Sequence, residues 1–223
     1  TKGGGIVRIN NYSSDKEPLT SFNRISAANS TLTDNAVYCF APGATGKLWI
    51  GTENGINYYS YQSKQLKEFP VVADNKKVKY VHSINELNDT TLWVSTVGEG
   101  IVKVILNNTG SLPVVKSATR IVLDKGRMAS NYFFTSFQES DSILWFGNRG
   151  YGAYRLNVET GEMTPYKFDD VVKSQTANDI FAIYKNGKGY WLGTSSGLLH
   201  LNQDYSHRHD RADLFSNNTV HGI

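Results

Sequence analysis

Four tryptophans mark a repeat that runs through this chain of 223 residues. Trp49, Trp93, Trp145 and Trp191 are 44, 52 and 46 residues apart. Each lies in a copy of one phrase, and the copies read KLWIGTENGINYYS, TLWVSTVGEGIVKVI, ILWFGNRGYGAYRLN and YWLGTSSGLLHLN. A period of about 47 residues is typical of propeller blades and too long for leucine-rich repeats. The chain is therefore expected to fold as a series of equivalent units.

Each copy has the pattern of a β-hairpin. An apolar–Trp–apolar segment leads into a short turn that contains glycine, and an alternating run such as Gly55–Ser60 follows. Tight turns between strands need a positive φ, which glycine adopts without strain. Another alternating segment precedes each tryptophan, and a more variable one, such as Gln65–Pro70, follows each hairpin. The preceding segments are Asp34–Pro42, Lys79–Leu87, Ser130–Gln138 and Asn178–Lys185.

Four short strands per period and no helical pattern predict an all-β fold of four-stranded propeller blades. We expect a single propeller segment over 1–223, with four complete blades and a partial blade at each end, cut from a larger propeller of seven blades. We expect each tryptophan to be buried in the second strand from the axis. The predicted units are a partial blade at 1–10, blades at 11–60, 61–105, 106–157 and 158–202, and the start of another blade at 203–223.

An asparagine stands where the first strand of three repeats should begin. Asn35, Asn131 and Asn178 lie 13 or 14 residues before their tryptophans, and Lys79 replaces the asparagine in the second copy. Asparagine side chains commonly close turns by accepting backbone hydrogen bonds. We therefore assign these three residues, like the tryptophans, a structural role in the repeat.

Composition excludes several classes of function. The 23 basic and 20 acidic residues are dispersed, so there is no basic stripe of the kind that binds nucleic acid. No run of 18 apolar residues indicates a membrane span. The one cysteine, Cys39, cannot form an internal disulfide and is expected to pack as a small hydrophobe.

The sequence shows no catalytic, cofactor or metal constellation. The segment Ala41–Trp49 loosely resembles the tryptophan-docking motif of quinoprotein propellers, but Gly43 replaces the aspartate of that motif. The carboxylates lie mostly at expected turns, which gives no acid–base pair. His207 and His209 stand in a loop that we interpret as solvated. His82, His200 and His221 stand alone and are interpreted as packed or edge residues.

Candidate ligand-binding residues are those that break the repeat near the expected mouth of the central channel. Loops at the end of a rigid scaffold commonly carry binding residues. Tyrosine and arginine suit sugars and uronates through ring stacking and bidentate contacts. The candidates are Lys79, Tyr80, Tyr132, Arg149, Tyr151 and Asp179.

The repeat resembles the two-component regulator propeller repeat. The strongest copy is LTDNAVYCFAPGATGKLWIGTENGINYYS, which begins at Leu32, and the copy TANDIFAIYKNGKGYWLGTSSGLLHLN is nearly as good. The other two copies depart at Lys79 and at Gly147–Asn148. The resemblance extends over essentially the whole chain, because every segment falls into a repeat.

The resemblance implies the periplasmic sensor region of a hybrid two-component histidine kinase of the Bacteroides type, an inner-membrane protein that signals by phosphorelay. Such a region would bind a glycan-derived oligosaccharide and signal by conformational change, without a cofactor and without catalysis. Its partners would be the remaining blades of the parent chain and, in the full-length receptor, a second copy. The alternatives are a non-enzymatic protein-interaction scaffold and a carbohydrate-active or quinoprotein-type enzyme.

Overall fold

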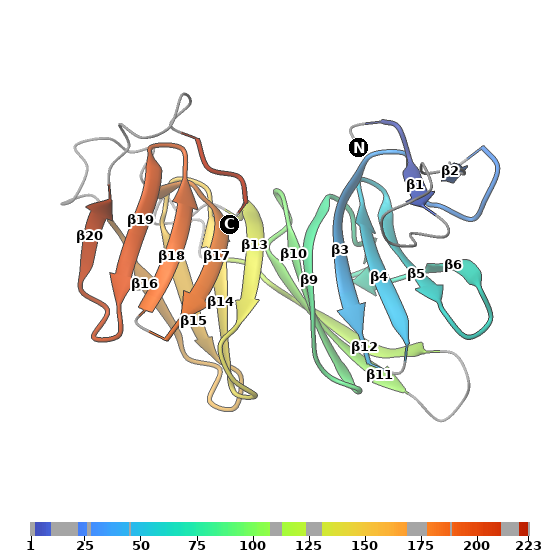
Figure 1. Ribbon diagram of the computed structural model, residues 1–223. Helices are drawn as coiled ribbons and strands as arrows, with labels where there is room; N and C mark the ends of the chain where they lie inside the picture. Colours follow the sequence, from blue (N-terminus) through green and yellow to red (C-terminus); the bar gives the residue numbers. More distant parts are fainter. Residues whose placement is uncertain are drawn as a thin grey trace.

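The computed structural model contains four antiparallel sheets of four strands, each built from strands that follow one another in the chain (Figure 1). It describes residues 3–9, 22–25, 28–44, 46–107, 113–123, 131–168, 178–187, 189–210 and 219–222. The sheets fan out as blades, with one edge strand of each toward the middle of the molecule (Figure 1). The predicted all-β propeller architecture is confirmed.

We number the sheets as blades one to four. Blade one contains β3 (Val37–Gly43), β4 (Lys47–Thr52), β5 (Gly55–Ser60) and β6 (Gln65–Phe69). Blade two contains β9 (Val81–Asn88), β10 (Thr91–Thr96), β11 (Ile101–Asn107) and β12 (Val114–Ile121). Blade three contains β13 (Phe133–Gln138), β14 (Ile143–Asn148), β15 (Ala153–Asn157) and β16 (Met163–Tyr166). Blade four contains β17 (Ile180–Asn186), β18 (Gly189–Thr194), β19 (Gly197–Asn202) and β20 (His207–Asp210).

Two short hairpins complete the described strands. β1 (Ile6–Ile9) pairs with β2 (Phe22–Ile25) beside blade one, and β7 (Val72–Ala73) pairs with β8 (Lys76–Lys77) between blades one and two. The β1–β2 hairpin extends past the partial blade expected at 1–10, because β2 lies within the blade predicted at 11–60. At the other end, the backbone N–H of Val220 donates to Thr194 O at 2.9 Å, so residues 219–222 lie against the second strand of blade four.

The sheets correct the predicted blade boundaries at 60, 105, 157 and 202. Each of those boundaries falls after the third strand and assigns the fourth strand to the following blade. In the structure the fourth strand is hydrogen-bonded to the third strand of its own repeat, as in β5–β6, β11–β12, β15–β16 and β19–β20. The blades therefore begin at the inner strand that precedes each tryptophan and end with the outer strand.

The inner strands β3, β9, β13 and β17 lie next to one another around the axis. Glycines in the neighbouring tryptophan strands permit this close approach. A Cβ atom at Gly51 would lie 2.6 Å from the carbonyl oxygen of Val81, and one at Gly147 would lie 2.6 Å from that of Ile180. Such distances exclude a side chain at Gly51 and Gly147, so these glycines set the spacing from blade one to blade two and from blade three to blade four, whereas blade two has Ser95 at this position.

The hydrophobic core lies between the blades. Successive strand residues point to opposite faces of a sheet, so the tryptophan of one blade faces the next blade and its apolar neighbours face the previous one. Trp49 thus packs with Leu92 and Val94 of blade two, and Trp93 packs with Leu144 of blade three. Trp49, Trp93 and Trp145 are at most 2% exposed, as predicted.

Trp191 is the exception to the predicted burial of all four tryptophans, since it is only half-buried. Its neighbours Tyr190 and Leu192 belong to the core between blades three and four, so the indole points to the opposite face of blade four. Among the described residues no further sheet covers that face. The Trp191 ring instead lies 4.6 Å from the ring of His200 on the adjacent strand.

The repeated asparagines link neighbouring blades. Asn131 Oδ1 accepts from the backbone N–H of Leu123 at 2.8 Å, and Asn178 Oδ1 accepts from that of Phe168 at 2.9 Å. Their carbonyl groups, and that of Asn35, accept from glycine N–H groups of the preceding unit. These bonds fix the inner strands of blades one, three and four to the unit before them, which positions the loops at one end of the channel.

Candidate functional site

A pocket of about 340 Å³ lies at the rim between blades two and three, lined by Tyr80, Val97, Gly98, Glu99 and Tyr132. Main-chain contacts build it. The N–H of Val97 donates to Tyr80 O at 3.0 Å, and the N–H of Gly98 donates to Asn131 O at 3.0 Å. Tyr80 and Tyr132 are 41% and 40% exposed, so both rings are available to a ligand.

Charges of both signs surround this rim pocket. The Arg149 guanidinium lies 5.9 Å from the ring centre of Tyr132, and the backbone N–H of Arg149 donates to Tyr132 O at 3.0 Å. Glu99 is paired with Arg120, whose Nη1 is 2.8 Å from Glu99 Oε2. Glu99 is already neutralised by the nearly buried Arg120. Of these two arginines, Arg149 is therefore the exposed one that can meet a ligand.

Three of the six candidate ligand residues thus come together, namely Tyr80, Tyr132 and Arg149. Lys79 is adjacent to them and exposed, with its backbone N–H 3.4 Å from Glu99 Oε2. The other two candidates make other contacts. Tyr151 packs against the core between blades two and three and lies 5.8 Å from Lys167 Nζ, while Asp179 accepts from Ser195 Oγ at 3.0 Å.

The inner strands carry a second set of side chains, which the sequence reasoning missed. Each inner strand has a β-bulge directly after its first paired residue, and the extra residue is aromatic every time. These rings and His221 line a pocket of about 490 Å³ in the central channel. We call the five residues the aromatic belt: Tyr38, His82, Phe134, Phe181 and His221.

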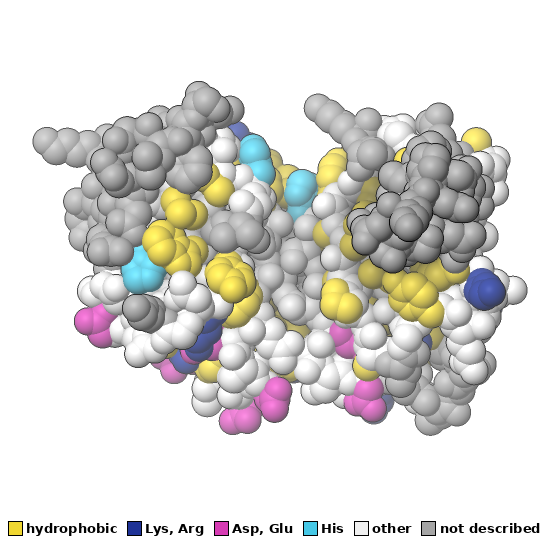
Figure 2. Space-filling view, viewed as in Figure 1, with side chains coloured by type: hydrophobic (Ala, Val, Ile, Leu, Met, Phe, Trp, Pro, Cys, Tyr) yellow, Lys and Arg dark blue, Asp and Glu magenta, His cyan; other side chains and the backbone are white. Residues whose placement is uncertain are grey.

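The interpretation of His82 and His221 as packed or edge residues is therefore incomplete, because both line the channel. Figure 2 shows the molecule hollowed between its two halves, with histidine side chains on the walls of the hollow. An alignment of the four repeats would have revealed these channel residues, because the position after Val37, Val81, Phe133 and Ile180 is aromatic in each copy.

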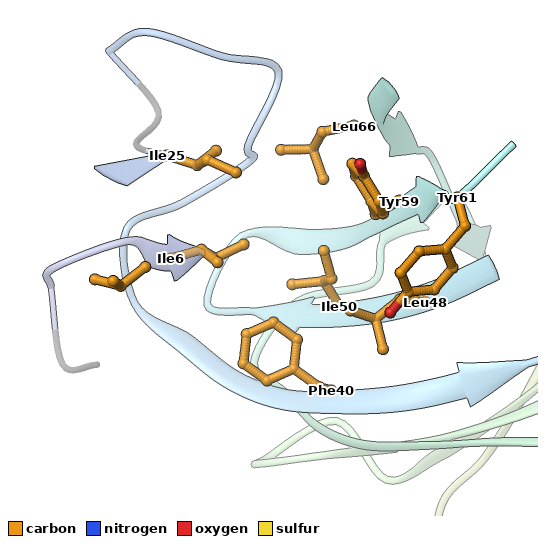
Figure 3. A pocket seen from close by; sticks show the side chains of 9 residues that line it. Ile6, Ile25, Phe40, Leu48, Ile50, Tyr59, Tyr61 and Leu66 are labelled. Atoms are coloured by element: carbon orange, nitrogen blue, oxygen red, sulfur yellow. The ribbon is translucent and has the colours of Figure 1, made fainter. Parts of the chain in front are cut away.

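A third hollow, of about 400 Å³, lies between the β1–β2 hairpin and blade one (Figure 3). Ile6, Phe40 and Ile50 point into it, and among the described residues that line it two tyrosines supply the side-chain polar groups. It is continuous with the apolar core cluster that joins Ile6 to Ile50. This hollow resembles the packing space between two blades and offers a ligand few directed hydrogen bonds.

Polar side chains deeper in the molecule stabilise packing between blades. Glu139 accepts from Trp145 Nε1 at 2.7 Å and lies 3.4 Å from Lys185 Nζ and from Arg155 Nε. Although burial opposes ionisation, the hydrogen bonds from Trp145 and Tyr190 and the two cations hold the pKa of Glu139 below its usual value. A carboxylate held in this way is a structural anion rather than a proton donor.

The described residues contain no group of three histidine, cysteine or acidic side chains that could hold a metal. The side chains of His207 and His209 lie outside what the structure describes. No helix long and apolar enough to cross a membrane occurs in the described ranges.

Comparison with known proteins places the fold and the repeat. Residues 31–54 match the family model described as "Two component regulator propeller". The chain is similar to histidine kinase P4 of Formosa agariphila, with 29% identity over 172 residues, which is 75% of this chain and 12% of that protein. The chain therefore spans only a small part of this curated relative.

Solved structures from B. thetaiotaomicron are similar in fold. The extracellular domain of BT4673, described as a hybrid two component system, gives a TM-score of 0.74 at 18% identity over 97% of this chain and 29% of that one. The extracellular domain of BT3049, described in the same way, gives 0.59 at 20% identity over 90% and 25% of the two chains. The matched segment, residues 31–54, lies in the copy in which the sequence resemblance is strongest, so this segment carries the two-component regulator propeller repeat.

Proposed function

We propose that this chain is part of the periplasmic sensor region of a hybrid two-component histidine kinase, and that it binds a glycan-derived oligosaccharide without transforming it. The similarity to a histidine kinase and to extracellular domains of two-component systems supports the sensor role. The partners of this role are the remaining blades of the parent chain and, in the full-length receptor, a second copy.

The observation that carries the ligand assignment is the rim pocket. Tyr80 and Tyr132 present half-exposed rings, and Arg149 lies over one of them. Aromatic faces stack on sugar rings, and an arginine fork can bind a carboxylate or hydroxyls on the same ligand. Such a contact set gives micromolar affinity, on the order of −8 kcal/mol.

The position of the pocket also suggests how binding could be transmitted. Tyr80, Val97 and Glu99 belong to blade two and its connection, whereas Tyr132 and Arg149 belong to blade three. A ligand that touches both blades favours one relative arrangement over another. Only such a difference in affinity between two states is needed to shift a conformational equilibrium.

Calorimetry of the protein against neutral and uronate oligosaccharides tests the proposal. We expect binding by the unaltered protein that weakens about tenfold in Tyr132→Ala and Arg149→Ala. Arg149→Lys keeps the charge but loses the planar guanidinium fork, so its affinity should lie between those of the unaltered protein and Arg149→Ala. Tyr61→Ala, which removes an exposed tyrosine far from this rim on blade one, is the matched control.

The outcomes separate the alternatives. Release of shortened sugars during the titration would indicate an enzyme. A protein that binds no sugar would support the scaffold alternative and contradict the sensor proposal. Sugar binding that is unchanged in both rim variants would move the site elsewhere on the propeller.

A further inference from the structure

Four of the five residues of the aromatic belt occupy the same position in the four inner strands. In β3, Val37 pairs with Thr52 and Cys39 pairs with the preceding residue, Gly51, so Tyr38 is the extra residue of a bulge. The same two-for-one pairing makes an aromatic residue the extra one in β9, β13 and β17. A bulge turns its side chain away from the regular alternation of a strand. Here it turns each ring out of the core between blades and into the channel.

The five rings follow one another without a break around the channel wall. The ring of Tyr38 stacks on that of His82 with centroids 4.1 Å apart, and His82 is 5.7 Å from Phe134. Phe134 is 4.9 Å from Phe181, which is 4.6 Å from His221. Because these side chains are only partly buried, the belt presents a continuous aromatic surface to a hollow of about 490 Å³. That volume lies within the range of small-molecule sites, about 300–1,000 Å³.

Among the residues that the structure describes, the lining of this hollow is polar but includes no aspartate, glutamate, lysine or arginine. Between and below the rings stand Cys39, Ser83 and Thr135. Burial lowers the pKa of His82 to about 4, so its imidazole is neutral at neutral pH and can both donate and accept. The Tyr38 hydroxyl donates to Glu53 Oε2 at 3.1 Å and keeps its lone pairs as acceptors.

This chemistry selects a class of ligand. A carboxylate or sulfate group would enter the hollow without a cation to balance it, and burial of an unpaired charge is costly. A purely apolar molecule would offer no hydrogen bond to the His82 imidazole or to the lone pairs of the Tyr38 hydroxyl. A ring with apolar C–H faces and peripheral hydroxyls satisfies both parts of the lining.

We infer that the aromatic belt is a subsite for an uncharged, hydroxyl-bearing ring, that is, a sugar unit without a carboxylate or sulfate. The inference rests on the proposed function and adds to it a second subsite, deeper than the rim pocket and of different charge preference. The ligand would be an oligosaccharide with a neutral unit in the channel, while an acidic unit, where there is one, meets Arg149 at the rim.

Calorimetry with neutral oligosaccharides tests the subsite. Phe181→Ala should weaken binding about tenfold or more, because it removes a stacking face. Phe181→Leu should weaken binding less, because it keeps the apolar volume. Tyr184→Ala lies on the same strand, removes a side chain that is 49% exposed and does not line the hollow, so it serves as the matched control. Far-UV circular dichroism verifies that each variant is folded.

Saturation-transfer NMR on the unaltered protein gives a second readout that does not depend on variant folding. We expect the strongest transfer to the C–H protons of a neutral sugar unit. Binding that is equal in the unaltered protein and Phe181→Ala would overturn the belt subsite and leave the sensor proposal standing. Strongest transfer to a uronate unit would overturn the inferred charge preference. If no oligosaccharide binds at all, both the proposed function and this inference fail.

Discussion

Trp145→Ala and Trp191→Ala change the same position of the repeat, yet the structure predicts very different losses of stability. Trp145 is fully buried, with its ring 5.0 Å from that of Tyr166 and 5.1 Å from that of Tyr190. Trp191 faces the open side of blade four and is half-buried. The comparison isolates the contribution of packing between blades, because the strand and its local sequence are nearly the same.

The magnitudes follow from burial. Replacement of a buried tryptophan by alanine costs about 3–5 kcal/mol, and Trp145 also donates to Glu139, a charge-assisted hydrogen bond of roughly 1.5–3 kcal/mol. We therefore expect Trp145→Ala at or above the upper end of that range. The side chain of Trp191 is only partly buried, so its loss should be smaller, and we expect about 2 kcal/mol or less.

Phenylalanine variants separate the hydrogen bond from the volume. Trp93 is as buried as Trp145, but its Nε1 has no acceptor among the described residues. Trp93→Phe relieves that unpaired donor, whereas Trp145→Phe removes a partner from the Glu139 carboxylate. Trp145→Phe should therefore be more destabilising by at least about 1 kcal/mol.

Urea unfolding followed by far-UV circular dichroism measures these differences, with the slope of the transition as a check that each variant still unfolds in one step. Equal losses for Trp145→Ala and Trp191→Ala would refute the argument, because they would mean that the open face of blade four is covered in solution. Equal losses for the two phenylalanine variants would refute the role given to Glu139.

Two further predictions concern backbone strain and pH. Gly150 and Gly152 both have positive φ, 79° and 80°, but a Cβ atom at Gly152 would lie 2.0 Å from Tyr166 O, whereas one at Gly150 would meet nothing within 4 Å. Thermal unfolding should therefore show a loss of stability of about 1–2 kcal/mol for Gly150→Ala and a clearly larger loss for Gly152→Ala. Similar losses for the two variants would contradict the close approach at Gly152. For His82, the folded pKa of about 4 lies below the unfolded value near 6.5, so the unfolded chain binds the proton first and stability falls as the pH drops from about 6.5 to 4. The full shift corresponds to roughly 3 kcal/mol, which partial exposure reduces to about 1–2 kcal/mol; His82→Phe should remove this component, and parallel pH profiles of the two proteins would contradict it.

The fold was predictable because its signals recur in every repeat. Alternation located the inner strands, and the phrase around each tryptophan located the central hairpin. The residue at which each blade begins and ends was not predictable in the same way. The outer strands β6, β12, β16 and β20 share no residue pattern, so nothing in the sequence states that they pair with the preceding strand rather than the following one.

The candidate site was predictable only in part. Tyr80, Tyr132 and Arg149 were chosen because they break the repeat, and they do gather at one rim. Tyr151 and Asp179 break the repeat equally, but the ring of Tyr151 lies near Lys167 and Asp179 accepts a hydrogen bond from Ser195. Departure from a repeat marks a position as unusual, but which unusual positions share a pocket depends on how the blades are arranged around the axis.

The aromatic belt escaped the sequence reasoning for a different reason. Strict alternation places Tyr38 and Phe40 on one face of a strand, whereas the bulge at Tyr38 shifts that residue out of the alternation and leaves Phe40 toward the β1–β2 hairpin. Reading along one strand cannot detect such a bulge. Reading down the aligned copies can, because the inner strands lie side by side and equivalent positions converge on the axis. In a propeller the residues of one column form one surface, so a column that is aromatic in every copy predicts a ring-lined channel even where no single strand does.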